Sequence, residues 1–224
     1  MLCNIPPEQI TSNLVMEPSR LSEKVPYKLV QIEGKGRGLV ASRTLEIGEL
    51  VLSEKAFLKT SSKFDVSFFA RLEPEIRAKL MNLSCLADSR LKDDNQILQM
   101  KFLANCIAAM PSGAESDVSV VFEIISMINH SCMPNVVWFP EEDEQTRKEV
   151  RVCRRIQEEE EIVSSYIELS ELPLRQQRRD MLRPRGFVCR FSFSLFPIHF
   201  DFQGVSCVSF LERSWRRMRS LGGV

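Results

Sequence analysis

Asn129-His130-Ser131-Cys132-Met133-Pro134-Asn135 is the stretch of this sequence that decides the fold, and it follows an apolar run over residues 120–128. Taken alone, it allows plain structural roles. Asn129 could bond a turn backbone, and His130 could be a buried histidine with satisfied hydrogen bonds. Because the chain has one other histidine, His199, a histidine metal site is not expected.

Two further short stretches carry chemistry. Lys35-Gly36-Arg37-Gly38-Leu39 lies between apolar segments, and its glycines, with Gly34, predict a tight turn that joins two strands. Ser165-Tyr166-Ile167 ends a short strand predicted over residues 162–167. Gly186-Phe187-Val188-Cys189 follows a charged segment that is predicted to be helical.

In this order and at this spacing, the stretches resemble the SET-domain protein lysine methyltransferases, and within them the group related to the SET-and-MYND proteins. The resemblance covers roughly residues 26–189. It implies a mainly β fold with an α-helical insert, in which small, mostly antiparallel sheets surround a cofactor and one segment passes under another in a knot-like crossing. We therefore expect the segments around positions 36, 130 and 166 to converge on one cleft.

The resemblance implies the function, an S-adenosylmethionine-dependent methyl transfer to the side-chain amine of a protein lysine. It also implies a set of cofactor-binding residues, which are Lys35, Gly36, Arg37, Asn129, His130, Tyr166 and Phe187. Within this set Tyr166 is implied to be catalytic, and Phe187 to pack against the adenine ring. Without the resemblance, Tyr166 would be an ordinary strand tyrosine, Phe187 core filler, and Lys35 and Arg37 solvated charges.

The implied chemistry is a direct displacement that needs no metal and no covalent enzyme intermediate. Free lysine has a pKa near 10.4, so its deprotonation near neutral pH costs about 4 kcal/mol. A narrow apolar channel lowers this cost because it disfavours the ammonium form, and alignment of the reacting groups contributes the rest. Tyr166 would orient these groups and stabilise the changing charge. It is not assigned as a general base.

Three departures from the family pattern stand out. Residues 58–128 contain only Cys85 and Cys106 and no histidine, so the zinc-binding MYND module is absent. The post-SET pattern C-x-C-x-x-C, which with the cysteine of the first stretch holds zinc in the family, is broken. Cys132 and Cys189 match it, but positions 191 and 194 hold Phe and Ser, so we expect no zinc. Glu159 replaces the usual glycine of a turn, and a positive φ there would cost roughly 1 kcal/mol.

In the family, the post-SET segment closes the lysine channel, and in this chain the cysteine pattern of that segment is broken. The alternative function is therefore a catalytically weak or inactive SET module that acts as a protein-binding domain. The expected partner under the first function is a protein that carries a histone or non-histone lysine.

The sequence predicts three parts. Residues 1–24 are expected to be a flexible leader, residues 25–189 the SET domain, and residues 190–224 an atypical tail in place of the post-SET segment. Apolar residues at helical spacing predict a packed helical insert over about residues 64–110. Strands are predicted over residues 136–139 and 150–153, on either side of an acidic turn.

Composition limits the class of protein. The 224 residues include 30 basic and 30 acidic side chains, and this balance argues against direct nucleic-acid binding. No apolar run is long enough for a membrane span, and the first residues lack the layout of a signal peptide. The seven cysteines are scattered and odd in number, as in reduced proteins. We expect an intracellular protein, in the nucleus or the cytoplasm.

Overall fold

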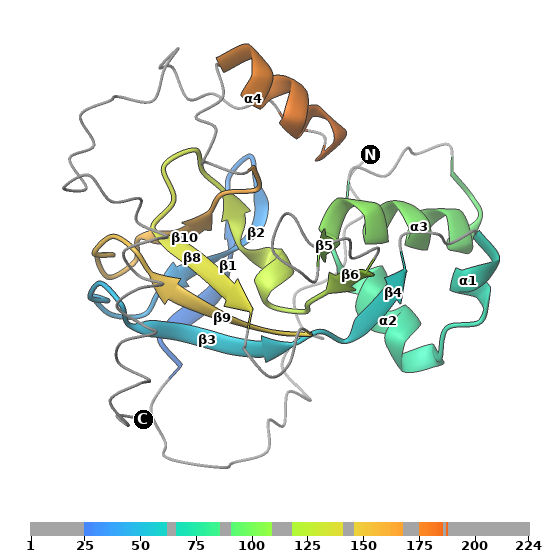
Figure 1. The fold of residues 1–224 in the computed structure, drawn as a ribbon, viewed down its shortest axis with the longest axis horizontal. Coiled ribbons are helices and arrows are strands. Elements are labelled where there is room, and N and C mark those ends of the chain that lie inside the picture. Colours follow the sequence, from blue (N-terminus) through green and yellow to red (C-terminus); the bar gives the residue numbers. More distant parts are fainter. Residues whose placement is uncertain are drawn as a thin grey trace.

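Short strands arranged in three small sheets form the frame of the molecule (Figure 1). The structure is a computed structural model that describes residues 25–61, 66–85, 91–108, 118–140, 146–167, 175–185 and 187. The leader over residues 1–24 and the tail over residues 190–224 lie outside the described residues. None of the helices within the described ranges is long and apolar enough to cross a membrane.

The first sheet brings together strands that are far apart in the sequence. Its order is β1 (Tyr27–Ile32), β2 (Gly36–Ala41), β10 (Glu161–Ser164) and β7 (Asn129–His130). β1 and β2 are antiparallel and joined by a tight turn, as the glycines predict. β10 pairs antiparallel with β2 and parallel with β7. It therefore lies between β2, which carries the glycines, and β7, which begins with Asn129.

The other two sheets are antiparallel. One has the order β3 (Leu50–Lys55), β9 (Arg147–Val152) and β8 (Val136–Pro140). The other has the order β4 (Leu58–Ser61), β6 (Val118–Val121) and β5 (Ile107–Ala108). β8 and β9 occupy the positions of the two strands predicted around the acidic turn. Small antiparallel and mixed sheets are the fold class that the resemblance implied.

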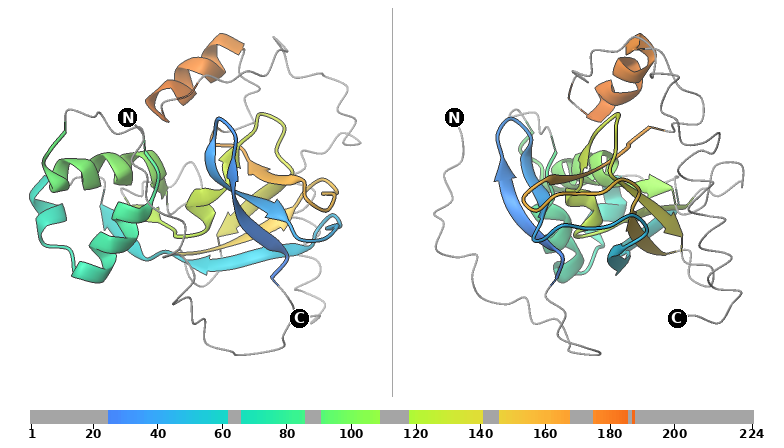
Figure 2. Two further views of the ribbon diagram at one scale, coloured as in Figure 1. Left: turned by 180° about the vertical axis from the view of Figure 1, so that it is seen from behind. Right: turned by 90° about the vertical axis from the view of Figure 1, so that its left-hand side faces the viewer.

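Three helices lie between β4 and β5 in the chain: α1 (Val66–Ala70), α2 (Pro74–Asn82) and α3 (Asp94–Asn105). They cluster at one end of the molecule, away from the first two sheets (Figures 1 and 2). Asp93 caps the start of α3, since its carboxylate accepts a hydrogen bond of 2.9 Å from the Gln96 amide. α4 (Arg175–Leu182) and the short 3-10 turn η3 (Arg183–Arg185) follow near the end of the described chain.

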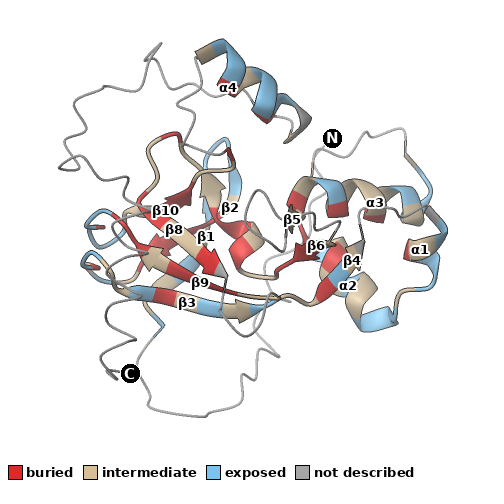
Figure 3. Ribbon diagram, in the orientation of Figure 1, coloured by how far each residue is buried: buried red, intermediate tan, exposed pale blue. Residues whose placement is uncertain are grey.

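Two apolar cores hold these parts together (Figure 3). The larger one fills the space between the first two sheets and includes Leu39, Val150 and Ile162, all fully buried. The second one joins the helices to the strands β4 and β6 through residues such as Phe69 and Phe102. The buried apolar residues of α3 are thus packed core, as their helical spacing predicts.

Polar side chains hold the backbone around residues 129–135 in place. Asn135 is fully buried; its amide donates to the Glu161 carbonyl at 2.8 Å and its oxygen accepts from the Val163 amide at 2.8 Å. Glu54 of β3 accepts from the backbone amides of Glu123, Ile124 and Ile125 at 2.6–3.1 Å. It therefore caps the 3-10 turn η2 (Ile125–Met127), which leads into β7.

Glu159 adopts a left-handed backbone, with φ of 64°. This confirms the expectation for a position where the family usually has glycine, and the cost is about 1 kcal/mol. The Lys28 ammonium forms an ion pair with the Glu159 carboxylate at 2.5 Å. The pair is exposed, so it offsets little of the strain.

Candidate active site

The site begins with the turn between β1 and β2. Gly34 and Gly36 have φ of 72° and 80°, which is backbone that favours glycine. Gly38 serves a different purpose. A Cβ atom at this position would lie 2.4 Å from Ile32 Cδ1 and 2.6 Å from Asn129 Nδ2. The missing side chain therefore makes room for the Asn129 amide against the strand.

Asn129 links the first stretch to β10. Its Nδ2 donates to the Arg37 carbonyl at 3.2 Å and to Glu161 Oε1 at 3.0 Å. The second oxygen of Glu161 forms an ion pair with the Lys35 ammonium. The Arg37 side chain turns toward the helices, where it hydrogen-bonds the Asn82 Oδ1 at 3.3 Å and the Asn82 carbonyl. Both cations of the glycine-bearing turn thus have protein partners.

His130 is held as a neutral imidazole. The Tyr166 amide donates to its Nδ1 at 3.0 Å, so the neutral ring carries its proton on Nε2, which lies 3.2 Å from Cys132 Sγ. Burial, aided by the positive charges of Arg185 and others, lowers the pKa of His130 from 6.5 to about 4. Close to neutral pH the imidazole therefore donates and accepts hydrogen bonds but carries no charge.

Tyr166 lies beside His130 with its phenol proton directed at a backbone acceptor. The hydroxyl donates to the Ile128 carbonyl at 2.7 Å. Burial raises the pKa of Tyr166 from 10.0 to about 12, although the Arg185 charge lowers it, and the Glu161 carboxylate also raises it. The group stays protonated at neutral pH, which suits an orienting role and disfavours a general base.

Phe187 completes a group of three rings. Its centroid lies 5.7 Å from that of His130 and 6.1 Å from that of Tyr166, and the His130 and Tyr166 rings are 5.3 Å apart. Phe187 is 37% exposed, so part of its surface is available to a flat ligand. Such a ring can stack on an aromatic base.

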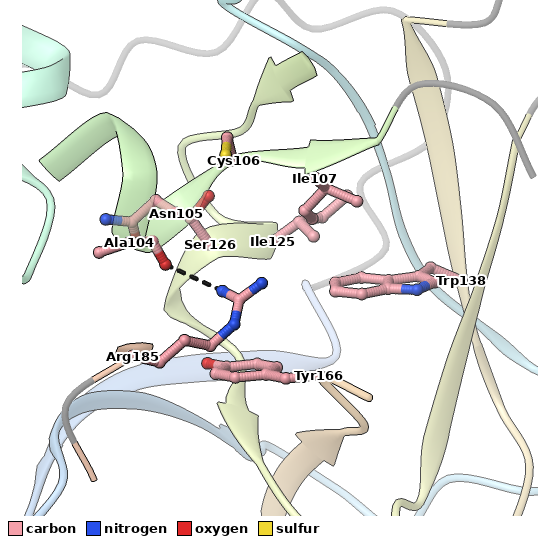
Figure 4. Close-up of a pocket in the computed structure, with 9 residues that line it drawn as sticks. All are labelled: Ala104, Asn105, Cys106, Ile107, Ile125, Ser126, Trp138, Tyr166 and Arg185. Atoms are coloured by element: carbon pink, nitrogen blue, oxygen red, sulfur yellow. Dashed lines mark hydrogen bonds between the residues drawn. The ribbon is translucent and has the colours of Figure 1, made fainter. Parts of the chain in front are cut away.

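A cavity of about 210 Å³ opens next to these rings (Figure 4). The residues that line it come from the end of α3, β5, η2, β8, the segment after β10 and η3: Ala104, Asn105, Cys106, Ile107, Ile125, Ser126, Trp138, Tyr166 and Arg185. The Tyr166 ring forms one wall of this cavity, and the Arg185 guanidinium extends over it (Figure 4). The walls are mostly apolar, with a few polar groups.

The residues present fit the cofactor that the resemblance implies. The close approach that Gly38 permits, the Asn129 amide and the partly exposed Phe187 ring suit a ligand with a polar amino-acid end and a flat base.

The structure brings together the three predicted stretches, since the strands and side chains of the segments around positions 36, 130 and 166 are hydrogen-bonded to one another. Sequence reasoning missed Glu161, Arg185 and Trp138, and the cavity residues on α3 and β5. Helical spacing marked α3 as packed core, and no sequence pattern indicated which end of the helix would face a cavity. Arg185 stands directly before Gly186-Phe187 but carried no signal of its own.

Among the described residues, no group of three or more His, Cys, Asp or Glu side chains is arranged to hold a metal ion. Cys85, Cys106, Cys132 and Cys153, which lie in the described ranges, are not joined in disulfides. Cys189 and the two non-matching positions 191 and 194 lie outside the described ranges.

The geometry brings the β1–β2 turn, Asn129, a neutral imidazole and a protonated tyrosine together in one place. Comparison with protein families matches residues 36–167, more than half of the chain, to the SET domain. The chain belongs to the SET domain family.

Two similar proteins are named as histone-lysine N-methyltransferases. The chain is 27% identical over 170 residues to "Histone-lysine N-methyltransferase set5" of Schizosaccharomyces pombe, covering 73% of this chain and 48% of that protein. It is 39% identical over 72 residues to "Histone-lysine N-methyltransferase ATXR2" of Arabidopsis thaliana, covering 32% and 15% respectively. The chain therefore spans about half of the first relative and less of the second.

Among solved structures, a Plasmodium falciparum protein described as a histone methyltransferase aligns with 65% of this chain and 96% of its own chain. The sequence identity is 11% and the TM-score is 0.38.

Proposed function

We propose that this protein transfers a methyl group from S-adenosylmethionine to the side-chain amine of a lysine in a protein substrate, histone or non-histone. One observation carries the proposal: three distant stretches meet at a single site, where the Asn129 amide contacts the Arg37 carbonyl and the Tyr166 amide contacts His130. Membership of the SET domain family and the names of the relatives support it.

S-adenosylmethionine, when bound, supplies a methyl group on a sulfonium for direct displacement by the lysine amine. Lys35, Gly36, Arg37, Asn129, His130 and Phe187 are proposed to bind it. Gly36 contributes through its backbone, and Phe187 through its ring. The neutral His130 holds the Tyr166 backbone at 3.0 Å, which fixes the tyrosine beside the bound cofactor.

Tyr166 is the proposed catalytic residue and also contacts the cofactor. Its phenol keeps its proton, because burial raises its pKa to about 12. The hydroxyl oxygen, which donates to Ile128, still has lone pairs that can orient the amine and the methyl group. The apolar walls contributed by Ile107, Ile125 and Trp138 would pack against the apolar stem of the acceptor lysine.

The finer assignments belong to the same proposal. We place the protein in the group related to SET-and-MYND proteins, without the MYND module and without zinc. Its SET domain spans residues 25–189, with a helical insert over about residues 64–110, and residues 190–224 take the place of the post-SET segment. We further propose that it acts inside the cell, in the nucleus or the cytoplasm, and binds neither nucleic acid nor membrane directly.

The test has two measurements. Calorimetry should detect S-adenosylmethionine binding, and radiolabelled methyl transfer to a panel of histone and non-histone proteins should detect turnover. Tyr166→Phe should reduce turnover roughly a hundredfold and leave cofactor affinity nearly unchanged. Tyr27→Phe is the matched control, because Tyr27 is the other tyrosine of the chain and lies on β1.

Two results would count against the proposal. Cofactor binding without turnover on any protein would favour the alternative, an inactive SET module that binds partner proteins. Unchanged turnover in Tyr166→Phe would remove Tyr166 from the catalytic role.

A further inference from the structure

The guanidinium of Arg185 is placed inside the cavity as a ligand would be. Its central carbon lies 4.8 Å from the centroid of the Tyr166 ring. One of its nitrogens, Nη1, donates to the Ala104 carbonyl at 2.9 Å. Figure 4 shows the side chain reaching from η3 across the face of the ring toward α3.

These contacts are the ones that select a cationic side chain. An aromatic face attracts a cation through its quadrupole, and Ala104 lies in the last turn of α3, where unpaired carbonyls carry the negative end of the helix dipole. The cavity walls otherwise include apolar groups such as Ile125 and Trp138. A lysine side chain, with an apolar stem and a cationic head, would meet the same two contacts.

We propose that Arg185 is an internal competitor for the acceptor pocket: its guanidinium occupies the position that the cationic side chain of a substrate takes, and the substrate enters by displacing it. This inference rests on the proposed function, since it assigns the cavity beside Tyr166 as the acceptor site. Arg185 thereby sets how strongly a substrate must bind before its lysine reaches Tyr166.

The attachment of Arg185 permits displacement. It lies at the end of a three-residue 3-10 turn, and a short turn of this kind is easily rearranged. Within the described ranges, its polar and ring contacts are the hydrogen bond to Ala104 and the contact with the Tyr166 ring, and no carboxylate of these ranges forms an ion pair with it. Both contacts are of the kind that an incoming lysine would replace.

The pocket can be tested without knowledge of the protein substrate, with n-butylammonium, the side chain of lysine, as the probe. Its dissociation constant for the full chain is measured by NMR titration. Arg185→Ala and Arg185→Gln should each bind n-butylammonium about tenfold more tightly than the wild type, because the cost of displacing a cation–π contact and a hydrogen bond is removed.

Arg183→Ala is the matched control. It removes the same charge from the same turn, but the Arg183 side chain is 78% exposed and pairs with Asp180. It should leave the affinity for n-butylammonium unchanged. A similar gain in Arg183→Ala would mean that net charge, not occupancy, controls the pocket, and would overturn the proposal.

Equal or weaker n-butylammonium binding in Arg185→Ala and Arg185→Gln would also overturn it, as would the absence of binding in every variant. Calorimetry with S-adenosylmethionine on the same proteins separates this inference from the proposed function. If S-adenosylmethionine binds but the Arg185 variants have the wild-type affinity for n-butylammonium, only the proposed role of Arg185 is rejected. If the Arg185 variants bind n-butylammonium more tightly but no variant binds S-adenosylmethionine, the pocket is a cation site blocked by Arg185, and the proposed methyltransferase function is rejected.

Discussion

At the scale of single residues, the site depends on groups that stay neutral in a buried, positively charged setting. His130 and Tyr166 are both kept uncharged by burial, with their pKa values moved to about 4 and about 12. Each has a defined hydrogen-bond partner, Cys132 for the imidazole and Ile128 for the phenol. The charges in the site thus come from Lys35, Glu161 and Arg185, while the neutral rings of His130 and Tyr166 orient neighbouring groups through hydrogen bonds.

The neutral state of His130 predicts a pH dependence of stability. Its folded-state pKa of about 4 lies below the ordinary value of 6.5, so the unfolded chain binds more protons between these values. The free energy of unfolding should therefore fall as the pH drops through this window, by up to about 3 kcal/mol. Urea unfolding at about pH 7 and about pH 5 measures the difference, and His130→Gln should make it smaller. An equal pH dependence in both proteins would contradict the assignment.

Gly38 predicts a steric effect. The added Cβ of Gly38→Ala would overlap Ile32 and Asn129 at 2.4 and 2.6 Å, so we expect a loss of about 1–3 kcal/mol in the free energy of unfolding and weaker S-adenosylmethionine binding in calorimetry. Gly34→Ala is the control. Nothing lies within 4 Å of its Cβ, so it should cost about 1 kcal/mol of backbone strain and keep the cofactor affinity. Equal affinities in the two variants would argue against this role of Gly38.

At the scale of elements, the short turn η2 determines where the site residues stand. It contributes Ile125 and Ser126 to the cavity, and the next residues supply the Ile128 carbonyl and the Asn129 amide. A three-residue turn has too few internal hydrogen bonds to hold itself. Its position comes from the Glu54 carboxylate, which accepts from three successive amides at its start.

We therefore expect Glu54→Ala to lower the free energy of unfolding by about 2–3 kcal/mol, because it leaves buried amides without an acceptor. Chemical denaturation measures this change. Glu75→Ala is the control: its carboxylate is 80% exposed and pairs with Lys79 on α2, so its effect should stay within about 0.5 kcal/mol. Similar losses in the two variants would show that the carboxylate does not hold η2.

At the scale of the whole molecule, the cavity lies where the two apolar cores meet. Ala104 to Ile107 come from the end of α3 and from β5, whereas Trp138 belongs to β8 and Tyr166 to the segment that follows β10. Arg37 and Arg185 bridge the two parts through the carbonyls of Asn82 and Ala104, at the ends of α2 and α3. The arrangement of the helices relative to the sheets therefore shapes the cavity.

The sequence predicts that the protein holds no structural zinc ion. With Cys at two of four positions, the purified chain should hold substoichiometric zinc by elemental analysis, and a chelator should not change its unfolding temperature. The double variant Phe191→Cys with Ser194→Cys restores the pattern and should bind one zinc ion. One equivalent of zinc in the unmodified chain would overturn the prediction.

The sequence by itself determined the family, the class of fold and the three stretches that meet at the site. It also indicated the strained turn at Glu159, because a glycine position filled by another residue can be read from the pattern alone. These features are local: glycine spacing, a seven-residue motif and alternating strands are written in neighbouring residues.

Only the tertiary structure decided which side chains share the cavity. Residues 104, 125, 138, 166 and 185 meet there although they belong to separate elements. The partners of Lys35 and Arg37, and the position of Arg185 over Tyr166, depend on how helices and sheets pack. Packing brings together groups of any sequence separation, and burial then shifts their pKa values, so neither can be read from the order of residues along the chain.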